Sequence, residues 1–292
     1  MLVSPSGPAP RERVDAGIAY LESWGLKVEI APGALDRSGY LAGDDDTRLA
    51  GLNTAFRDPN VRAVVCTRGG YGAQRIVDGI DIDAIRADPK VLAGFSDITA
   101  LHIALYQRAG LAGVQSPMLA WNPDRTGTES AESLRNALMS TAQVVLTARS
   151  NEETSPVRVP GPTTHGTLLG GNLSLIVSSI GTPDMLDLAG AILLIEDVNE
   201  APYKIDRMLT HLRRTGALDG VAAVAVGQFT GCADGWTTTI VDVLQERLGD
   251  LGVPVLGGLP TGHGQEQLSV GVGVPATLNT ADGTLTVEAA VA

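Results

Sequence analysis

The sequence predicts an α/β fold whose N-terminal part is a doubly wound, mostly parallel sheet. Two observations carry this prediction. Short apolar segments alternate with amphipathic helical segments along the first part of the chain, which is the pattern of repeated βα units. In addition, residues 61–67 (VRAVVCT) form a continuous apolar run, as expected for a strand that is buried on both faces of a parallel sheet.

The N-terminal elements follow one another with short connections. A short strand at 1–4 precedes an amphipathic helix at 13–25, and residues 27–32 are the next predicted strand. The predicted helix 44–58 begins with consecutive aspartates, and the helix dipole favours negative charge in a first turn. The remaining predicted elements of this part are the strand 91–93, the helix 99–109 and the strand 111–115.

The length of the chain suggests two domains, and a polar segment separates them. Residues 1–120 are the predicted N-terminal domain. Residues 121–162 are rich in Thr, Ser, Asn and Glu and are predicted to connect the domains, with one helix at 130–138. Residues 163–292 are the predicted C-terminal α/β domain. Its predicted elements are the strands 189–196, 221–229 and 253–258, the helices 203–214 and 236–249, and short strands within 268–291.

The charge of the chain argues against two classes of partner. The formal net charge is −12, from 33 acidic and 21 basic residues, whereas nucleic acids and anionic membranes both require a basic surface. No apolar run approaches the ~20 residues of a membrane span. The first 13 residues also lack the basic and apolar segments of a signal peptide. We therefore expect a cytoplasmic protein with no nucleic-acid or membrane partner.

The two cysteines, Cys66 and Cys232, stand in neither a metal-ligand spacing nor a CxxC spacing. We expect two reduced, buried thiols. No cluster of metal-ligating residues is visible in the sequence, so we expect neither a metal ion nor another cofactor.

Ser96 stands between the predicted strand 91–93 and the predicted helix 99–109, with almost no loop on either side. In a nucleophile elbow, such a turn lifts the serine Oγ out of the sheet and directs helix N–H groups at developing negative charge. Gly94 gives the turn room, but the G-x-S-x-G pattern is only half met because Ile98 takes the last position. From this stretch alone, Ser96 is either a nucleophile or a helix N-cap.

A nucleophilic serine needs a base, and the chain has four histidines. His102 and His211 lie inside amphipathic helices and are predicted to be structural. His165 lies at the start of the C-terminal domain. His263 lies in a glycine-rich loop just beyond the predicted strand 253–258, and open α/β sheets place their ligand sites in such loops. His263 is therefore the better candidate.

The base needs an orienting acid, and Glu196 closes the apolar strand 189–196 with Asp197 directly after it. Either residue could orient a histidine, or both could belong to a solvated strand end. The chain order Ser96, Glu196, His263 is also the order of nucleophile, acid and base in α/β-hydrolases.

A glycine-rich loop follows the strand 61–67. Gly69, Gly70 and Gly72 leave backbone N–H groups exposed, which suits an oxyanion hole or a phosphate cradle. Neither the GxxxxGK[ST] nor the GxGxxG spacing is present, and a plain strand-to-helix turn remains the alternative.

Six stretches of the chain, in the right order, together resemble the LD-carboxypeptidase family of serine peptidases, which trim murein tetrapeptides. Each stretch is a weak signal alone, but their order across nearly the whole chain is specific. The stretches are 4–8 (SPSGP), 39–76 (which contains Arg-Gly-Gly-Tyr-Gly), 94–102 (GFSDITALH), 168–176 (LLGGNLSLI), 193–212 and 259–264 (LPTGHG).

The resemblance implies that Ser96 is the nucleophile, His263 the base and Glu196 the orienting acid. It also implies that the backbone N–H groups of Gly70 and Asp97 form the oxyanion hole. The site would lie in a cleft between the doubly wound domain and a smaller C-terminal α/β domain, with no metal ion, in a homodimer. The implied reaction is release of terminal D-alanine from murein tetrapeptides during peptidoglycan recycling.

A carboxypeptidase must recognise a free carboxylate, for which the fork of an arginine is well suited. Arg68 and Arg207 both lie in the stretches that resemble the family. Arg207 is expected to form an ion pair near Asp206 or Glu200, whereas Arg68 is a candidate substrate contact, together with its neighbour Gly69.

Two features depart from the family pattern. The first strand is cut to Leu2 and Val3, where the family usually has more apolar residues. Ser116 stands in the stretch 114–118 where relatives tend to carry glycine before the proline. Its side chain is expected close to the cleft, so Ser116 is a further candidate substrate contact.

Two other functions remain open from the sequence. Microcin C self-immunity peptidases share the triad but cleave acyl-sulfamoyl adenylates or related peptidyl-nucleotide conjugates, and they would need an aromatic platform such as Trp121 or Trp236. A muropeptide- or nucleotide-binding module that uses the loop at 69–70 would bind its ligand without turnover. For a murein substrate, the third stem residue could be lysine or diaminopimelate.

Overall fold

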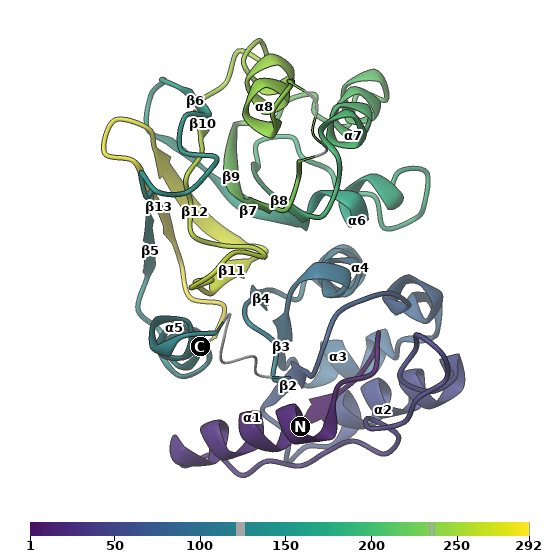
Figure 1. The fold of residues 1–292 in the computed structure, drawn as a ribbon. Helices are drawn as coiled ribbons and strands as arrows, with labels where there is room; N and C mark the ends of the chain where they lie inside the picture. Colours follow the sequence, from purple (N-terminus) through teal and green to yellow (C-terminus); the bar gives the residue numbers. More distant parts are fainter. Residues whose placement is uncertain (121–125, 234, 236, 292) are drawn as a thin grey trace.

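The structure is a computed structural model, and it describes residues 1–120, 126–233, 235 and 237–291. The described residues form two β-sheets, each with helices against it, and Figure 1 shows the N-terminal sheet below the C-terminal one. The α/β class and the two-domain architecture predicted from the sequence are therefore confirmed. No helix among these residues is long and apolar enough to cross a membrane.

The N-terminal sheet has the order β1–β2–β3–β4–β11, in which the first four strands are parallel and β11 is antiparallel to β4. The predicted strand 27–32 is reduced to a single parallel bridge between Leu2 and Ile30. Because β1 has only two residues, the segment 27–32 beside it can form few hydrogen bonds with it. The strands are β1 (Leu2–Val3), β2 (Ala63–Cys66), β3 (Val91–Gly94), β4 (Gly113–Gln115) and β11 (Val270–Val272).

Helices cover both faces of this sheet, as the doubly wound prediction requires. Val64 and Leu92 pack into one hydrophobic cluster, while their chain neighbours Val65 and Ala93 pack into another. This division follows from the alternation of side chains along a strand. The first cluster includes residues of α2 (Asp45–Arg57), α3 (Ile82–Ala87) and α4 (Thr99–Ala109), and the second includes residues of α1 (Arg11–Ser23) and α5 (Thr128–Met139).

The C-terminal sheet has the order β5–β13–β12–β7–β8–β9–β10–β6. Its central strands β7 to β10 are parallel, and antiparallel strands extend it on both sides. The segment 121–162, predicted as a connector, contributes β5 and β6 to this sheet. The strands are β5 (Val144–Thr147), β6 (Arg158–Val159), β7 (Thr164–Asn172), β8 (Ile192–Val198), β9 (Ala223–Thr230), β10 (Val255–Leu256), β12 (Val274–Asn279) and β13 (Thr284–Val287).

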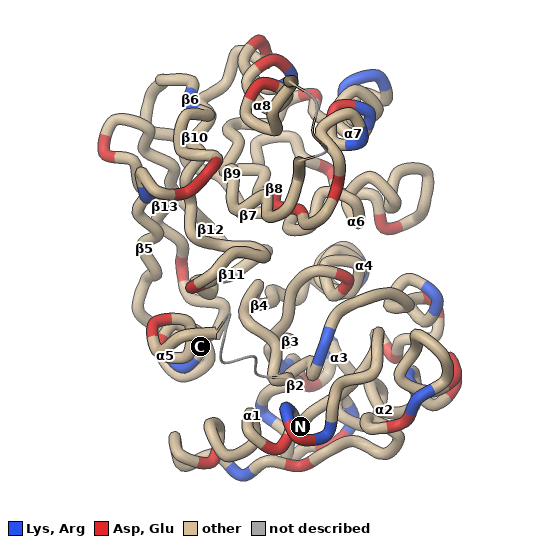
Figure 2. Tube along the Cα trace, in the orientation of Figure 1, with Lys and Arg blue, Asp and Glu red and all other residues tan. Residues whose placement is uncertain are grey.

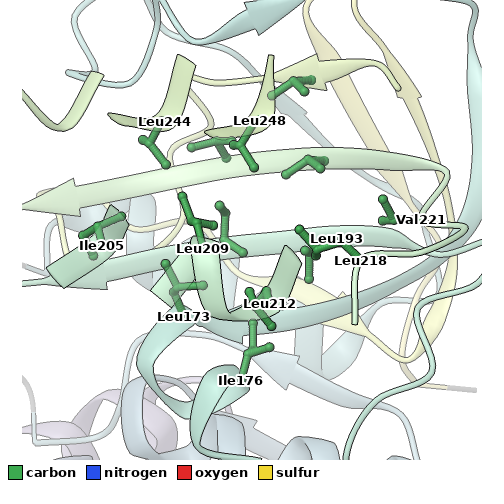
Figure 3. Close-up of a cluster of buried hydrophobic side chains, with 14 of the residues drawn as sticks. Leu173, Ile176, Leu193, Ile205, Leu209, Leu212, Leu218, Val221, Leu244 and Leu248 are labelled. Carbon is green, nitrogen blue, oxygen red and sulfur yellow. The ribbon is translucent and has the colours of Figure 1, made fainter. Parts of the chain in front are cut away.

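Three helices, α6 (Leu173–Ser178), α7 (Pro202–Arg214) and α8 (Ile240–Leu248), pack on one face of the C-terminal sheet. Figure 3 shows leucines and isoleucines of these helices gathered over the strands of the sheet, with the fully buried Leu193 of β8 among them. Both the strands and the helices of this cluster supply large aliphatic side chains. It is therefore a rigid base for the loops at the carboxyl ends of β8 and β10.

The two domains are joined by direct pairing as well as by the connecting chain. Strand β11 comes from the C-terminal part of the sequence but pairs with β4 of the N-terminal sheet. The Asn172 N–H at the end of β7 donates a hydrogen bond to Thr99 Oγ1 at the start of α4, at 3.0 Å. These contacts hold the carboxyl end of β3 close to that of β8.

Candidate active site

Ser96 occupies a strained turn between β3 and α4. Its φ is +64°, a left-handed conformation that costs a non-glycine residue about 1–3 kcal/mol. A short 3₁₀ turn, η3 (Ser96–Ile98), leads from it into α4. Ser96 is not a helix N-cap, because Phe95 and Ile98 hold the N-cap positions of η3 and α4. The backbone at Ser96 therefore has the geometry of a nucleophile elbow.

Ser96, His263 and Glu196 form one hydrogen-bonded chain across the domain boundary. His263 Nε2 lies 3.0 Å from Ser96 Oγ, and His263 Nδ1 lies 2.6 Å from Glu196 Oε2. Glu196 is fully buried and His263 is 8% exposed. The carboxylate fixes the imidazole by its Nδ1 side and leaves Nε2 directed at the hydroxyl, which is the relation of acid, base and nucleophile in a serine triad.

Glycines make room for the Glu196 side chain. A Cβ at Gly262, whose φ is +128°, would lie 2.9 Å from Glu196 Oε2. A Cβ at Gly227 would lie 3.3 Å from Glu196 Cβ and only 2.3 Å from the Thr261 carbonyl oxygen. Side chains at these positions would displace the acid or the histidine loop. The Phe95 ring packs against the His263 ring with centroids 4.5 Å apart and supports it from the elbow side.

Asp197 points away from His263 and is held by the start of α6. Its carboxylate accepts hydrogen bonds from Asn172 Nδ2 at 3.1 Å, from the Ser174 N–H at 3.0 Å and from Ser174 Oγ at 2.8 Å. Burial raises the pKa of Asp197 above its usual range, against the lowering effect of the Val198 N–H. Asp197 thus stabilises the junction between β7 and α6, while Glu196 faces the histidine.

The glycine-rich loop after β2 lies against the elbow. A Cβ at Gly69 would lie 3.1 Å from Ser96 Cβ and 3.3 Å from its Oγ, so a larger residue there would crowd the serine. Gly70 has φ +115°, and its N–H donates to no acceptor in the described part of the chain. An unpaired N–H beside the serine hydroxyl is what an oxyanion hole requires.

The side chain of Asp97 anchors this loop. Asp97 is 3% exposed, and its Oδ2 accepts hydrogen bonds from Ser6 Oγ at 2.6 Å and from the Ala73 N–H at 2.9 Å. The carboxylate therefore ties the loop after β1 and the loop after β2 to the elbow. From the sequence, Asp97 was a candidate only through its backbone N–H, and this role of its side chain was not predicted.

We expect Gly70→Val to lower kcat about 10²–10³-fold with a smaller effect on KM. The φ of +115° is accessible only to glycine, so valine would rotate the peptide and move the N–H away from its place beside Ser96. Steady-state kinetics with a murein tetrapeptide, the substrate that the family resemblance implies, would measure the change. Gly25→Val is the control, since Gly25 also has a positive φ, of +83°, at the end of α1. Parental kcat in Gly70→Val would contradict the oxyanion role.

The two other residues predicted to contact the substrate, Arg68 and Ser116, differ in their exposure to solvent. Arg68 is exposed, and its Nη1 donates to the Pro8 carbonyl oxygen at 2.9 Å. Ser116 is fully buried, and its Oγ donates to the Pro117 carbonyl oxygen at 3.2 Å. Trp121 and Trp236, considered as an aromatic platform, lie outside the described residues.

The ion pair predicted for Arg207 is wrong. Its guanidinium lies over the Tyr203 ring, 5.4 Å from the centroid. The two expected acids pair with other cations: Asp206 with Arg247 at 2.8 Å, and Glu200 with Lys204 at 3.0 Å. The ion pair between Arg247 and Asp206 joins α8 to α7. Because these residues are far apart in the sequence, the pattern of α7 alone could not predict their pairing.

The remaining histidines are separate from the Ser96 chain. His102 is buried in α4, where its Nε2 lies 3.3 Å from the Leu92 carbonyl oxygen, and burial lowers its pKa to about 4. His165 is exposed on β7, with Nδ1 2.8 Å from Thr277 Oγ1. His211 is exposed near the end of α7. His102 thus has the structural place that was predicted for it.

Both cysteines are buried and unpaired. Burial raises the pKa of the Cys66 thiol far above its usual value, and it raises the pKa of the Cys232 thiol to about 11. Thiolate is the reactive form, so we expect iodoacetamide to leave turnover unchanged at neutral pH. Residual D-alanine release after treatment measures this, and Cys66→Ala should behave like the parent. Rapid inactivation that substrate slows would contradict the prediction.

Gln228 is a residue near the site that the sequence analysis missed. Its Oε1 accepts from the Gly264 N–H at 2.8 Å, and its Nε2 donates to Glu152 Oε1 at 2.8 Å. Its backbone N–H also donates to the Thr261 carbonyl oxygen, at 2.9 Å. Gln228 thus holds the chain on both sides of His263. Because these contacts join segments far apart in sequence, no local pattern could have identified it.

Across the described ranges, no group of three or more His, Cys, Asp or Glu side chains is arranged to hold a metal ion. The arrangement at Ser96 consists of the side chains and backbone N–H groups described above. Its parts suit acyl transfer through a serine nucleophile.

Two family models match the chain. Residues 1–116 match the LD-carboxypeptidase N-terminal domain, and residues 165–278 match the LD-carboxypeptidase C-terminal domain. Among curated relatives, a Streptomyces coelicolor protein is 43% identical over 98% of this chain and 92% of its own length. A Bacillus subtilis protein named as a probable murein peptide carboxypeptidase is 38% identical over 99% of this chain and 91% of its own. The murein tetrapeptide carboxypeptidase of Pseudomonas aeruginosa is 31% identical over 95% and 92%.

Two solved structures have the same fold as this chain. The muramoyltetrapeptide carboxypeptidase of Oxalobacter formigenes matches with a TM-score of 0.84 and 28% identity, over 98% of this chain and 96% of that one. The protein MccF, solved in complex with glutamyl sulfamoyl guanosine, matches with a TM-score of 0.87 and 23% identity, over 98% and 94%. At that identity, the second match shows the fold alone.

Proposed function

The chain belongs to the LD-carboxypeptidase family, and on this premise we propose that it is a serine-type LD-carboxypeptidase that releases terminal D-alanine from murein tetrapeptides. The observation that carries the proposal is the hydrogen-bonded chain from Ser96 Oγ through His263 to Glu196 Oε2, with steps of 3.0 and 2.6 Å. The murein peptide carboxypeptidases among its relatives support the substrate class.

In the proposed reaction, His263 Nε2 takes the proton from Ser96 Oγ as the oxygen attacks the carbonyl carbon of the third stem residue. Glu196 stabilises the imidazolium that forms and keeps the ring in place. The imidazolium then gives its proton to the leaving nitrogen, the C–N bond breaks and D-alanine departs. Water, deprotonated by His263, attacks the acyl-serine, and the tripeptide leaves with a free carboxylate while Ser96 regains its proton.

The negative charge on the tetrahedral intermediate would be held by the N–H groups of Gly70 and Asp97. Each such donor contributes about 3 kcal/mol to stabilisation of the transition state in well-studied serine peptidases. The buried carboxylate of Asp97 fixes the loop that carries Gly70 and so keeps both donors in register with the serine.

The direct test is to incubate the protein with tetrapeptides ending in L-lysyl-D-alanine and in diaminopimelyl-D-alanine and to identify the products. We expect D-alanine and the tripeptide from at least one of them, and the comparison gives the preference at the third stem position. A tetrapeptide ending in L-alanine is the control and should stay intact. Absence of D-alanine release from both substrates would contradict the proposal.

The shared fold of MccF, which was solved with an acyl-sulfamoyl nucleoside, supports a second candidate. In it, the same residues would hydrolyse acyl-sulfamoyl adenylates or related peptidyl-nucleotide conjugates. Comparing kcat/KM for such a conjugate with that for the tetrapeptide separates the two candidates. The murein assignment predicts a higher value for the tetrapeptide.

We further place the enzyme in the cytoplasm, as a homodimer that takes part in peptidoglycan recycling. The formal net charge of −12 supports a soluble peptide substrate over an anionic membrane or a nucleic acid. Sedimentation equilibrium tests the oligomeric state, and a mass of one chain at micromolar concentration would contradict the homodimer.

A further inference from the structure

A hollow of about 500 Å³ is lined in part by Gly70. It is bounded by the loops after β1 and β2 and by the segment that precedes α2. After β1 the chain first pairs on one side of that strand, through the bridge at Ile30, and then returns to the other side as β2. The hollow therefore lies at the point between β1 and β2 where the order of strands in the sheet reverses. Open α/β sheets bind ligands at such a reversal. The residues lining the hollow are Gly7, Pro8, Arg37, Gly39, Tyr40, Arg68, Gly70 and Tyr71.

The lining has a positive charge that no acid of the hollow neutralises. It contains two arginines and no Asp or Glu. Neither Arg37 nor Arg68 makes an ion pair with a described residue, although many other arginines do, including Arg48 and Arg75, which both pair with Asp45. Acidic positions are otherwise spread over both domains (Figure 2). In a chain of net charge −12, two unpaired cations in one hollow are suited to an anionic ligand.

The hollow is also partly preorganised. Arg68 donates one N–H to the Pro8 carbonyl oxygen at 2.9 Å, which orients the guanidinium and leaves its other donors free of described acceptors. Tyr40 and Tyr71 are 67% and 52% exposed, and their rings meet edge to face with centroids 5.8 Å apart. They form a wall of the hollow that carries two phenol groups.

The hollow adjoins the residue to which we assign the oxyanion. In a peptide whose last bond is cleaved, the terminal carboxylate lies about one residue length, ~3.8 Å, beyond the scissile carbonyl. The Gly70 N–H, which we assign to the oxyanion, belongs to a residue that also lines the hollow. A leaving residue that extends from the oxyanion site past Gly70 would enter the hollow that Arg68 and Arg37 line.

We propose that this hollow is the leaving-group site, in which Arg68 and Arg37 bind the free carboxylate of the terminal residue. This inference rests on the proposed function and adds to it the reason why the enzyme would remove only the last residue. An amide or a further residue in place of the carboxylate would present no charge to the two guanidinium groups, and their unbalanced charge would disfavour binding.

The test compares two substrates, the tetrapeptide with a free C-terminal carboxylate and the same peptide with a C-terminal amide. We expect the parent enzyme to prefer the acid by about 10²-fold or more in kcat/KM. The double variant Arg37→Ala/Arg68→Ala should lose most of this preference, through a fall of roughly 10²-fold on the acid and a change of less than about threefold on the amide. Arg68→Lys, which keeps the charge but not the fork, should lose part of it.

Arg214→Ala is the matched control, because Arg214 is an exposed arginine at the end of α7 without an ion pair among the described residues. It should keep the parental ratio of acid to amide. Turnover of the amide by each variant shows that the variant is folded and its serine active. An unchanged ratio in the double variant would overturn the inference while the proposed function stood. Failure of the parent to cleave either peptide would instead contradict the proposed function, and the inference with it.

Discussion

Ser96→Ala should lower the rate of D-alanine release by roughly 10⁴-fold or more and leave the fold intact. The substitution removes the only atom that forms the acyl bond in the proposed reaction. It keeps the Cβ, so the turn at φ +64° and the contact with Gly69 are retained. Single-turnover kinetics and thermal unfolding of the same preparation would measure both effects.

Ser23→Ala is the control for this variant, since Ser23 is exposed and bonds only to the Tyr20 carbonyl oxygen at the end of α1. It should have parental activity. Undiminished D-alanine release by Ser96→Ala would remove Ser96 from the mechanism. Tetrapeptide binding that survives Ser96→Ala, together with no turnover by the parent protein, would instead identify a binding module.

Glu196→Gln should reduce kcat about 10⁴-fold, as the corresponding acid-to-amide change does in the serine protease triad. An amide can donate to His263 Nδ1 and so favours the wrong tautomer, with the proton on Nε2. The imidazole could then no longer accept the proton of Ser96. Steady-state D-alanine release at saturating tetrapeptide measures the loss.

Asp197→Asn is the matched variant, one residue along the same strand, and its effect on kcat should be much smaller. Its carboxylate contacts Asn172 and Ser174 at the start of α6, not the histidine. The loss of an acceptor there should lower the melting temperature and affect catalysis only weakly. A larger loss of kcat in Asp197→Asn than in Glu196→Gln would reverse the assignment of the two acids.

Alternation along a strand predicts that these two acids face opposite sides of the sheet, whereas the choice of Glu196 as the partner of His263 came from the family resemblance. Leu193 packs in the cluster under α6 and α7, and Leu194 packs in the cluster on the opposite face of the sheet. Glu196 shares the face of Leu194, and Asp197 lies with the helices. The elbow at Ser96 was equally visible, since it depends on a few consecutive residues.

Features that depend on distant parts of the chain could not be predicted in this way. The predicted strand 27–32 is a single bridge because its partner β1 is short. Strand β7 was missed because Gly170 and Gly171, at φ +118° and +136°, interrupt its apolar pattern. These glycines are needed there, since a Cβ at Gly170 would lie 2.2 Å from the Leu194 carbonyl oxygen.

The same limit applies to the site. The support of the histidine loop by Gln228 joins β9 to the segment 259–264, and the anchor at Asp97 joins the loops after β1 and β2 to the elbow. The hollow lined by Arg37 and Arg68 likewise forms only when three segments meet. Each of these features is a contact between loops whose relative positions are set by the sheets. The sequence of a single loop therefore could not predict it.

The central claim is that the reaction passes through an acyl-enzyme on Ser96, and partitioning with hydroxylamine tests it most directly. The tetrapeptide is turned over in increasing hydroxylamine, and the tripeptide acid and tripeptide hydroxamate are quantified beside D-alanine. An acyl-serine intermediate predicts that hydroxamate replaces the acid as hydroxylamine rises, while the sum of the two products equals the D-alanine released. Release of D-alanine with the tripeptide acid alone, at every hydroxylamine concentration, would contradict a covalent intermediate and with it the nucleophilic role of Ser96.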